Sequence, residues 1–289
     1  MNIGIIGLGL IGGSYGLAAK RSLPRVTLFG TDLDPEHLKE ALALGLVQKT
    51  LSEDQLSKMD LIIVAVPVDQ TEQLFLDLLD QINDNCLVMD VGSTKTTLCQ
   101  ALELHPKRNQ FLATHPIAGT EFSGPKAAFA SLFENQIQII CDSHKTRPDL
   151  LEWAQQWFLK MKMEIREMDP QEHDKHLAYV SHLSHISSFM LGKTVLEKEK
   201  DEQTIFEMAG SGFASTVRLA KSSPEMWTPI FKHNKSNILE VLKHYIENLE
   251  LFRTLLIQEE YEELLNQLKQ TNSITPILNG ILNKQYNKS

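Results

Sequence analysis

The chain has 289 residues, 42% of them hydrophobic, with a formal net charge of −9 and a pI near 5.6. This length is typical of two domains, and an acidic chain without a lysine- or arginine-rich run argues against a nucleic-acid-binding protein. No apolar run is as long as a membrane span, and the N-terminus has no signal-peptide pattern. The three scattered cysteines lack metal-ligand spacing and are typical of thiols in a reducing compartment, so we expect a cytoplasmic protein.

The first apolar run, residues 2–6, predicts a strand that leads into a glycine-rich turn. Gly7, Gly9 and Gly12 have G-x-G-x-x-G spacing, which is typical of a dinucleotide-binding turn that opens a helix. In this reading Gly7 permits the tight turn, Gly9 lets the backbone approach a pyrophosphate, and Gly12 lets helix and strand pack closely. The expected cofactor-binding segment therefore contains Gly7, Leu8, Gly9, Leu10, Ile11 and Gly12.

A second apolar run, residues 26–31, ends in Asp32. A carboxylate at this position can accept hydrogen bonds from both ribose hydroxyls of NAD and repels the 2′-phosphate of NADP. The alternative is that Asp32 only begins the turn before Pro35. The order of strand, glycines, helix, strand and acid favours NAD binding.

Short apolar runs and helical patterns alternate through the rest of the first half. Strands are predicted at residues 60–66, 86–91, 111–114, 137–141 and 164–167, the last at an edge. Helices are predicted at 35–43 (with Asp34 as N-cap), 69–82, 95–104 and 148–161. The alternation predicts an α/β fold with a Rossmann-type, doubly wound and mostly parallel sheet.

After residue 168 the strand signals disappear and long helical patterns follow. Helices are predicted at residues 170–199, 203–208, 215–220, 225–251 and 258–270, with a frayed polar tail at 279–289. We therefore expect two domains: a NAD-binding Rossmann domain at 1–168 and an all-α, substrate-binding and dimerisation domain at 169–289. Apolar stripes on the helices predict a homodimer held by this helical half.

Ligands in open α/β sheets sit beyond the carboxyl ends of the strands, so the residues that follow each strand are the first candidates. Val66 ends the third predicted strand and Pro67 follows it, and both are expected beside the nicotinamide. Ser93 and Lys95 follow the next strand, and His115 lies at the end of the strand after it. His115 is the best acid–base candidate. Alternatives stay open: a buried structural histidine for His115, a helix N-cap for Ser93, and a solvated first-turn side chain for Lys95.

The helical half contains a second group of polar and aromatic residues. His182 and His185 share a helix face, and His173 and His176 repeat the same spacing. A metal site is considered but not expected, because no cysteine or carboxylate completes a recognisable zinc pattern. Arg218 follows a glycine break and is suited to bind a carboxylate in two parallel hydrogen bonds, unless it is a surface residue. Trp227 lines the same pocket or fills the core.

Four segments together resemble the prephenate/arogenate dehydrogenase family of tyrosine biosynthesis. They are GLGLIGGS in the first turn, DVGSTK at residues 90–95, THPIAGTE at 114–121, and SHLSH at 181–185 with GSGFASTVRLAKSSPEMW at 210–227. The glycine motif is common to many families, whereas the later segments in series are much more specific. The resemblance spans about residues 1–270.

The resemblance implies the NAD-dependent conversion of prephenate to 4-hydroxyphenylpyruvate, CO₂ and NADH. His115 resembles the histidine that accepts the proton of the substrate 4-hydroxyl, and Ser93 the serine that orients it. Arg218 matches an arginine that binds a substrate carboxylate. The resemblance also implies substrate-pocket positions, which are His182, His185, Thr120, Trp227 and, within the S-x-K segment, Lys95.

This sequence departs from the family pattern at two places. Ser184 stands where proline is usual between the two helix histidines, and Ala214 and Ser215 replace a usual Arg-Asp pair. The missing arginine leaves prephenate and arogenate, or both, open as substrates, and Glu121 is a candidate acid for the ammonium of arogenate. No appended regulatory domain and no fused chorismate mutase domain are expected.

Two other interpretations stay open. A dehydrogenase of the β-hydroxyacid or pyrroline-carboxylate reductase type needs a catalytic lysine on the long helix or lacks the strand-end HPxxG, and Lys175 and Lys193 are available there. A NAD-binding sensor without catalysis is the non-enzymatic alternative, against which Ser93, His115 and Arg218 argue.

Overall fold

The computed structural model describes residues 1–120, 122–202 and 204–286, with side chains described up to residue 280. The chain divides into two compact units, residues 1–238 and 239–289, and each is described by itself. The first unit contains the whole sheet and every candidate site residue that the structure describes. No helix among the described residues is long and apolar enough to cross a membrane.

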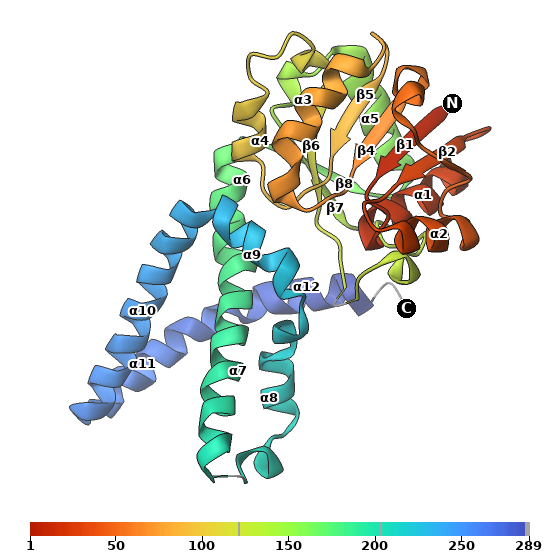
Figure 1. Ribbon diagram of the computed structural model, residues 1–289. Helices are drawn as coiled ribbons and strands as arrows, with labels where there is room; N and C mark the ends of the chain where they lie inside the picture. Colours follow the sequence, from red (N-terminus) through yellow and green to blue (C-terminus); the bar gives the residue numbers. More distant parts are fainter. Residues whose placement is uncertain (121, 203, 287–289) are drawn as a thin grey trace. The chain divides into compact units, whose positions relative to one another are not determined.

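An eight-stranded sheet forms the centre of the first unit, in the order β3-β2-β1-β4-β5-β6-β7-β8 (Figure 1). All neighbouring strands are parallel except the antiparallel pair β6 and β7, so the doubly wound, mostly parallel sheet is confirmed. The strands are β1 (Asn2–Ile6), β2 (Thr27–Thr31), β3 (Lys49–Thr50), β4 (Leu61–Val64), β5 (Leu87–Asp90), β6 (Phe111–Pro116), β7 (Ile137–Cys141) and β8 (Glu164–Met168). The two-residue β3 is the strand that the sequence did not predict.

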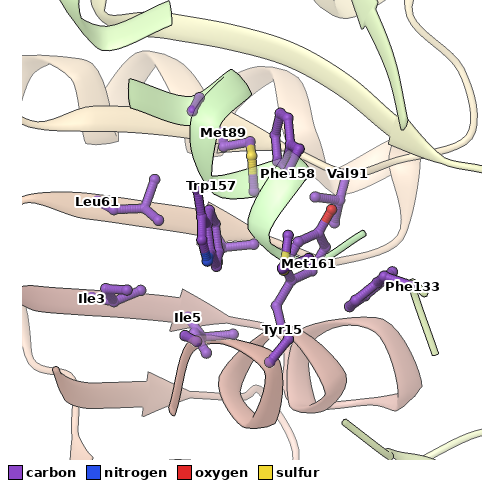
Figure 2. Packing of buried hydrophobic residues seen from close by; sticks show 14 of the residues in the cluster. Ile3, Ile5, Tyr15, Leu61, Met89, Val91, Phe133, Trp157, Phe158 and Met161 are labelled. Carbon is purple, nitrogen blue, oxygen red and sulfur yellow. The ribbon is translucent and has the colours of Figure 1, made fainter. Parts of the chain in front are cut away.

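Helices cover both faces of this sheet. One face packs against α1 (Leu10–Ser22), α2 (Pro35–Ala43) and α5 (Pro148–Lys160), and the other against α3 (Thr71–Gln81) and α4 (Thr96–Ala101). Figure 2 shows the first layer, where Trp157 and Phe158 of α5 pack with Tyr15 of α1 above the β1 residues Ile3 and Ile5. Burial of these aliphatic and aromatic side chains is the main force that fixes both helix layers on the sheet.

The chain turns helical after β8. Asp169 caps α6 (Pro170–Leu177), and a π-helical turn, η6 (Ala178–His182), joins it to α7 (Leu183–Glu202). Figure 1 shows α7 running away from the sheet with α8 (Ser211–Thr216) beside it. The first unit continues through short 3₁₀ turns, η7 (Ile205–Met208) and η8 (Arg218–Lys221), to α9 (Pro224–His233) and the beginning of α10 (Lys235–Ile257).

The second unit begins within α10 and continues with α11 (Tyr261–Thr271) and α12 (Thr275–Tyr286). No strand follows β8 in the described part of the chain, as the sequence predicted. The tail prediction was wrong, since α12 continues to Tyr286; residues 287–289 lie outside the described residues.

The long predicted helix at residues 225–251 is also wrong, because the chain leaves helical geometry at Asn234, between α9 and α10. The Asn234 side chain is buried and bonds to other segments of the chain, which makes a break here favourable. The predicted helix at 215–220 is instead the end of α8 followed by the 3₁₀ turn η8.

Candidate active site

The glycine-rich turn between β1 and α1 has the geometry that its spacing predicts. Gly7 has a φ of +90°, and a Cβ there would lie 2.5 Å from the Ala65 carbonyl oxygen. A Cβ on Gly12 would lie 1.9 Å from the carbonyl oxygen of Gly7, so helix and strand touch at this point. A Cβ on Gly9 would meet no atom within 4 Å, so the backbone of Gly9 is open to the approach of another molecule. Gly9 is also the N-cap of α1 and carries no side-chain cap.

Asp32 is held at the edge of this turn by backbone amides. Its Oδ2 accepts a hydrogen bond from the Leu8 amide at 2.7 Å, and its Oδ1 accepts one from the Asp34 amide at 2.9 Å. The carboxylate is 14% exposed, and the His37 ring lies 3.6 Å from Oδ1. Asp32 thus places a fixed negative charge beside the open glycine turn, and Asp34 caps α2 as predicted.

The segment after β5 is anchored by a buried ion pair. The ammonium of Lys95 contacts the Asp90 carboxylate and donates to the Thr114 carbonyl oxygen at 2.8 Å. Lys95 is fully buried and Asp90 nearly so. The structure therefore gives Lys95 neither the solvated nor the substrate-facing orientation considered from the sequence. Its ammonium instead joins the end of β5, through Asp90, to the Thr114 carbonyl of β6.

His115 at the end of β6 bonds to a histidine of α6. Its Nδ1 lies 2.9 Å from Nε2 of His173, and the other His173 nitrogen, Nδ1, lies 2.8 Å from Oδ1 of Asp174. His173 and Asp174 are almost fully buried, whereas His115 is half-buried. Nε2 of His115 has no hydrogen bond with any described residue.

Asp174 also caps α4, in a role that the sequence interpretation considered for Ser93. The amides of Lys95 and Thr96 donate to its two carboxylate oxygens, each at 2.8 Å. Three donors therefore converge on one carboxylate, and they stabilise its charged form. Ser93 itself makes no hydrogen bond with described residues.

Burial keeps the histidines of this region neutral. Burial, and after it the electrostatic influence of His173 and of the Lys95 ammonium, hold the pKa of His115 well below its usual value. Burial also lowers the pKa of His173, although Asp174 acts in the opposite direction. For Asp174, burial acts to raise the pKa, but the hydrogen bonds from His173 and Thr96 outweigh it, and the pKa is lowered.

His182 is buried at the end of the π-helical turn and has one unsatisfied nitrogen. The Asn237 amide donates to Oδ1 of Asn234 at 2.7 Å, which orients Asn234 so that its Nδ2 faces Nδ1 of His182 at 3.1 Å. Nδ1 of His182 therefore accepts, and Nε2 carries the proton. This Nε2 is buried without a hydrogen-bond partner among the described residues. Burial lowers the pKa of His182 to about 4.

His185 stacks on Trp227 of α9 with ring centroids 3.6 Å apart. The indole nitrogen of Trp227 is a second buried donor without a partner in the described chain. Trp227 packs on Val68, which lies just beyond β4 and after Val66 and Pro67, so α9 closes the site on the side of that strand end. The His182 and Trp227 rings contact each other, and each carries a buried N–H group without an acceptor in the described chain. This pair of donors indicates a site for a ligand with acceptor oxygens.

Arg218 lies in η8, exposed and without an ion pair to any residue that the structure describes. The pKa of His185 is lowered, and burial is the largest cause. The hydrogen bond to the Ser181 carbonyl acts to raise this pKa, and the positive charge of Arg218 acts to lower it. Arg218 thus adds an unpaired cation near the His185–Trp227 stack.

Some predicted residues lie apart from this cluster. Thr120 is exposed, and its hydroxyl accepts a hydrogen bond from the Phe122 amide at 3.2 Å. His176 is exposed on α6. Glu121 lies outside the described residues. Within those residues, no three side chains of His, Cys, Asp or Glu are placed to hold a metal ion.

Sequence reasoning missed His173, Asp174 and Asn234. His173 was weighed only as a metal ligand, through its spacing to His176. The adjacent His-Asp pair in the first predicted helix after the sheet was the available signal. Nothing in the local sequence marks Asn234.

Comparison with known families matches both halves of the chain. Residues 15–167 match the prephenate dehydrogenase nucleotide-binding domain, and residues 169–270 match the prephenate dehydrogenase dimerization domain.

Individual relatives cover most of the chain. A prephenate dehydrogenase of Bacillus subtilis is 34% identical, over 92% of this chain and 72% of its own. A cyclohexadienyl dehydrogenase of Zymomonas mobilis is 30% identical over 93% of each chain. The crystal structure of an Aquifex aeolicus prephenate dehydrogenase, in complex with hydroxyphenyl propionate and NAD⁺, superposes with a TM-score of 0.88 at 30% identity, covering 96% of this chain and 98% of that one. Two domain matches in the expected order and this extent of similarity assign the chain: it belongs to the prephenate dehydrogenase family.

Proposed function

We propose that this protein is a NAD-dependent dehydrogenase that converts prephenate to 4-hydroxyphenylpyruvate and CO₂. The observation that carries the proposal is the site around His115: a neutral imidazole whose Nε2 has no hydrogen bond to described residues, at the end of β6, which β4 and β5 separate from β1 and its glycine turn. Buried donors on His182 and Trp227 lie on the helices that close the site. The similarity to the Bacillus and Aquifex prephenate dehydrogenases supports it.

The residues of the first unit fit NAD. The open backbone at Gly9 and the uncapped N-terminus of α1 suit a pyrophosphate, since both offer amide donors and positive potential. Asp32 is fixed where it can accept from ribose hydroxyls, and Val66 and Pro67 border the expected nicotinamide position. When bound, NAD supplies the acceptor for the hydride that leaves C4 of the substrate.

His115 manages the proton of the substrate's 4-hydroxyl in this proposal. Its Nε2 accepts that proton as hydride leaves C4, so the hydroxyl becomes a carbonyl. The ring carboxylate then leaves as CO₂, the electron pair of the broken bond enters the ring, and the new phenolate oxygen takes the proton back. Atoms and charge balance without another reactant, and aromatisation makes the reaction strongly favourable.

The hydrogen-bond donors around the site are proposed to bind the two substrate carboxylates. We assign Nε2–H of His182 and Nε1–H of Trp227 to acceptor oxygens of the substrate, and Arg218 to a carboxylate. These groups counter the negative charge of the substrate in a protein that is itself acidic. Ser93, His185 and Thr120 remain candidate contacts, whereas the buried pairing of Lys95 leaves it out of the proposed contacts.

Arogenate, or both substrates, is the second candidate. The absence of the usual arginine at residues 214–215 and the similarity to the Zymomonas cyclohexadienyl dehydrogenase favour keeping it. The family assignment disfavours a β-hydroxyacid type of enzyme, and the exposed Lys193, paired with Glu197, is not suited to be its buried catalytic lysine.

The proposed organisation is a nucleotide-binding domain at 1–168 and a helical, substrate-binding and dimerisation domain at 169–289, in a homodimer. Apolar side chains exposed on the second unit support dimerisation; on α10 and α11 they are Leu239, Ile246, Leu249, Leu251, Phe252, Leu256, Ile257, Leu265 and Leu268.

The test is a matrix of initial rates: prephenate and arogenate, each with NAD and with NADP, followed by NADH or NADPH absorbance. The proposal expects prephenate with NAD to give the highest kcat/KM. A higher kcat/KM with arogenate would transfer the assignment to the second candidate. No reduction of NAD with either substrate would overturn both.

A further inference from the structure

We propose that His173 and Asp174 are positioning residues that hold His115 in the tautomer with its proton on Nδ1, so that Nε2 is ready to accept a proton before substrate arrives. The inference rests on the proposed function for its catalytic meaning. The tautomer itself is a property of the free protein and can be tested without a reaction.

The argument starts at Asp174. Its carboxylate receives the amides of Lys95 and Thr96 and faces Nδ1 of His173. The two amides can only donate, so both oxygens act as acceptors. A carboxylate with this many donors is stabilised in its ionised form even when it is buried.

An ionised Asp174 fixes the proton of His173. A bare Nδ1 would put a lone pair against the carboxylate, 2.8 Å away, so Nδ1 must carry hydrogen and donate. In a neutral ring Nε2 then has a lone pair and can only accept. The ring is fully buried, and the fully buried ammonium of Lys95 raises the energy of a second proton on it. His173 is therefore an acceptor toward His115.

His115 completes the chain. Because Nε2 of His173 accepts, the proton in the 2.9 Å contact belongs to Nδ1 of His115. The neutral His115 ring then has its lone pair on Nε2, the nitrogen with no hydrogen bond to described residues. The opposite polarity would need His173 to carry two protons in a buried position, which burial and Lys95 oppose.

The cap on α4 makes this arrangement rigid. Asp174 is bonded to the first turn of α4, which directly follows the Gly92–Thr94 loop, and Asn234 donates to the Asp174 carbonyl oxygen at 2.6 Å. The groups that set the proton on His115 are thus tied to the strand-end loop, to α6 and to the α9–α10 break. Ser93, the expected orienting residue, has no hydrogen bond in this network.

The direct test is ¹⁵N NMR of histidine-labelled free protein, with the His115 signals assigned by their loss in His115→Asn. We expect a pyrrole-type signal for Nδ1 and a pyridine-type signal for Nε2. His115 protonated on Nε2 in the unmodified protein would overturn the inference. This result does not depend on whether prephenate is the substrate.

Two substitutions at His173 test its role. His173→Phe keeps a ring but removes the acceptor, so His115 should shift its proton toward Nε2. If prephenate is oxidised, kcat should fall by about 10- to 100-fold, the range found for hydrogen-bond partners of metal-binding histidines, with the KM for NAD unchanged. His173→Gln can still accept through Oε1, and it should keep the Nδ1–H tautomer and restore most of kcat.

His176→Gln is the matched control, because His176 is an exposed histidine of the same helix. It should leave kcat and the His115 tautomer unchanged. A His173→Phe protein that is less stable but keeps the tautomer and kcat would make His173 merely structural and overturn the inference. Should that variant fail to fold, His173→Gln decides alone: an Nε2–H tautomer in it would contradict the role of the acceptor. Absence of activity in the unmodified protein would defeat the proposed function and leave the NMR test standing.

Discussion

Lys95 and Asp90, which both lie at the carboxyl end of β5, form a fully buried ion pair. The Lys95 ammonium also donates to Thr114, directly before His115. Lys95 therefore fixes the backbone that carries His115, the proposed base. Because its ammonium is buried and paired with Asp90, Lys95 is not available to bind a substrate carboxylate.

Lys95→Met should destabilise the fold by about 3–5 kcal/mol, because it leaves the Asp90 carboxylate buried and unpaired. Urea unfolding monitored by circular dichroism measures this loss. Lys39→Met is the control, since Lys39 and its partner Glu36 are both more than three-quarters exposed, and such pairs contribute only about 0–1 kcal/mol. A Lys95→Met protein of normal stability with a strongly raised prephenate KM would restore the substrate-binding role.

His115→Asn should lower kcat by roughly 10²-fold or more, because it removes the imidazole that is proposed to accept the hydroxyl proton. Binding of NAD, followed by fluorescence titration, should not change, since His115 lies apart from the glycine turn. Unchanged kcat in this variant would remove His115 from the mechanism.

The pH profile follows from the lowered pKa of His115. The neutral ring is the active form, so kcat should be constant around neutral pH and fall only as the pH drops well below about 6.5, the ordinary histidine value. A solvent-exposed imidazole would instead make kcat rise through that ordinary value. Rates measured from acid to neutral pH, with the fold checked by circular dichroism at each point, distinguish the two. A midpoint at the ordinary value would show that His115 is not desolvated as described.

Asp32→Asn should relax the preference for NAD, because it removes the charge that repels a 2′-phosphate while an amide oxygen can still accept from Leu8. We expect kcat/KM with NADP to rise about tenfold, which corresponds to ~1.4 kcal/mol. Asp32→Ser should act in the same direction but also lose the bond to Leu8. Equal use of both cofactors by the unmodified protein would defeat the role of Asp32.

Arg218→Ala should raise the KM for prephenate by roughly 10- to 100-fold, from the ~1.5–3 kcal/mol of a hydrogen bond to a charged group. The exposure of Arg218 argues for this range over the larger loss of a buried charge pair. Arg218→Lys should recover only part, since an ammonium lacks the two-pronged geometry. Lys221→Ala, in the same short turn, serves as the control. Identical KM values in all four proteins would make Arg218 a plain surface residue.

The sequence predicted most of the sheet because buried strands and the glycine turn leave local signals. The run at 61–66 and the positive φ required at Gly7 are examples. It did not predict β3, which has two exposed residues and forms only by pairing with β2. It also missed the helix break at Asn234, because that break is stabilised by Asp174 and His182, residues distant in the chain.

In the candidate site, too, residues with a local sequence signal could be predicted, and residues that depend on distant parts of the chain could not. His115 could be predicted from its place at a strand end. Its partner His173 could not be identified, since only the folded chain brings α6 against β6. Lys95 was misjudged for a related reason: its burial depends on Asp90 and Thr114 from two different strands.

The most direct test of the central claim is the stoichiometry of a complete reaction of prephenate with excess NAD, followed by NADH absorbance and by trapped CO₂. The account predicts one NADH and one CO₂ for each prephenate consumed, with 4-hydroxyphenylpyruvate as the product and with His115→Asn far slower than the unmodified protein. Loss of prephenate without NADH formation, or NADH formation at equal rates in both proteins, would contradict it.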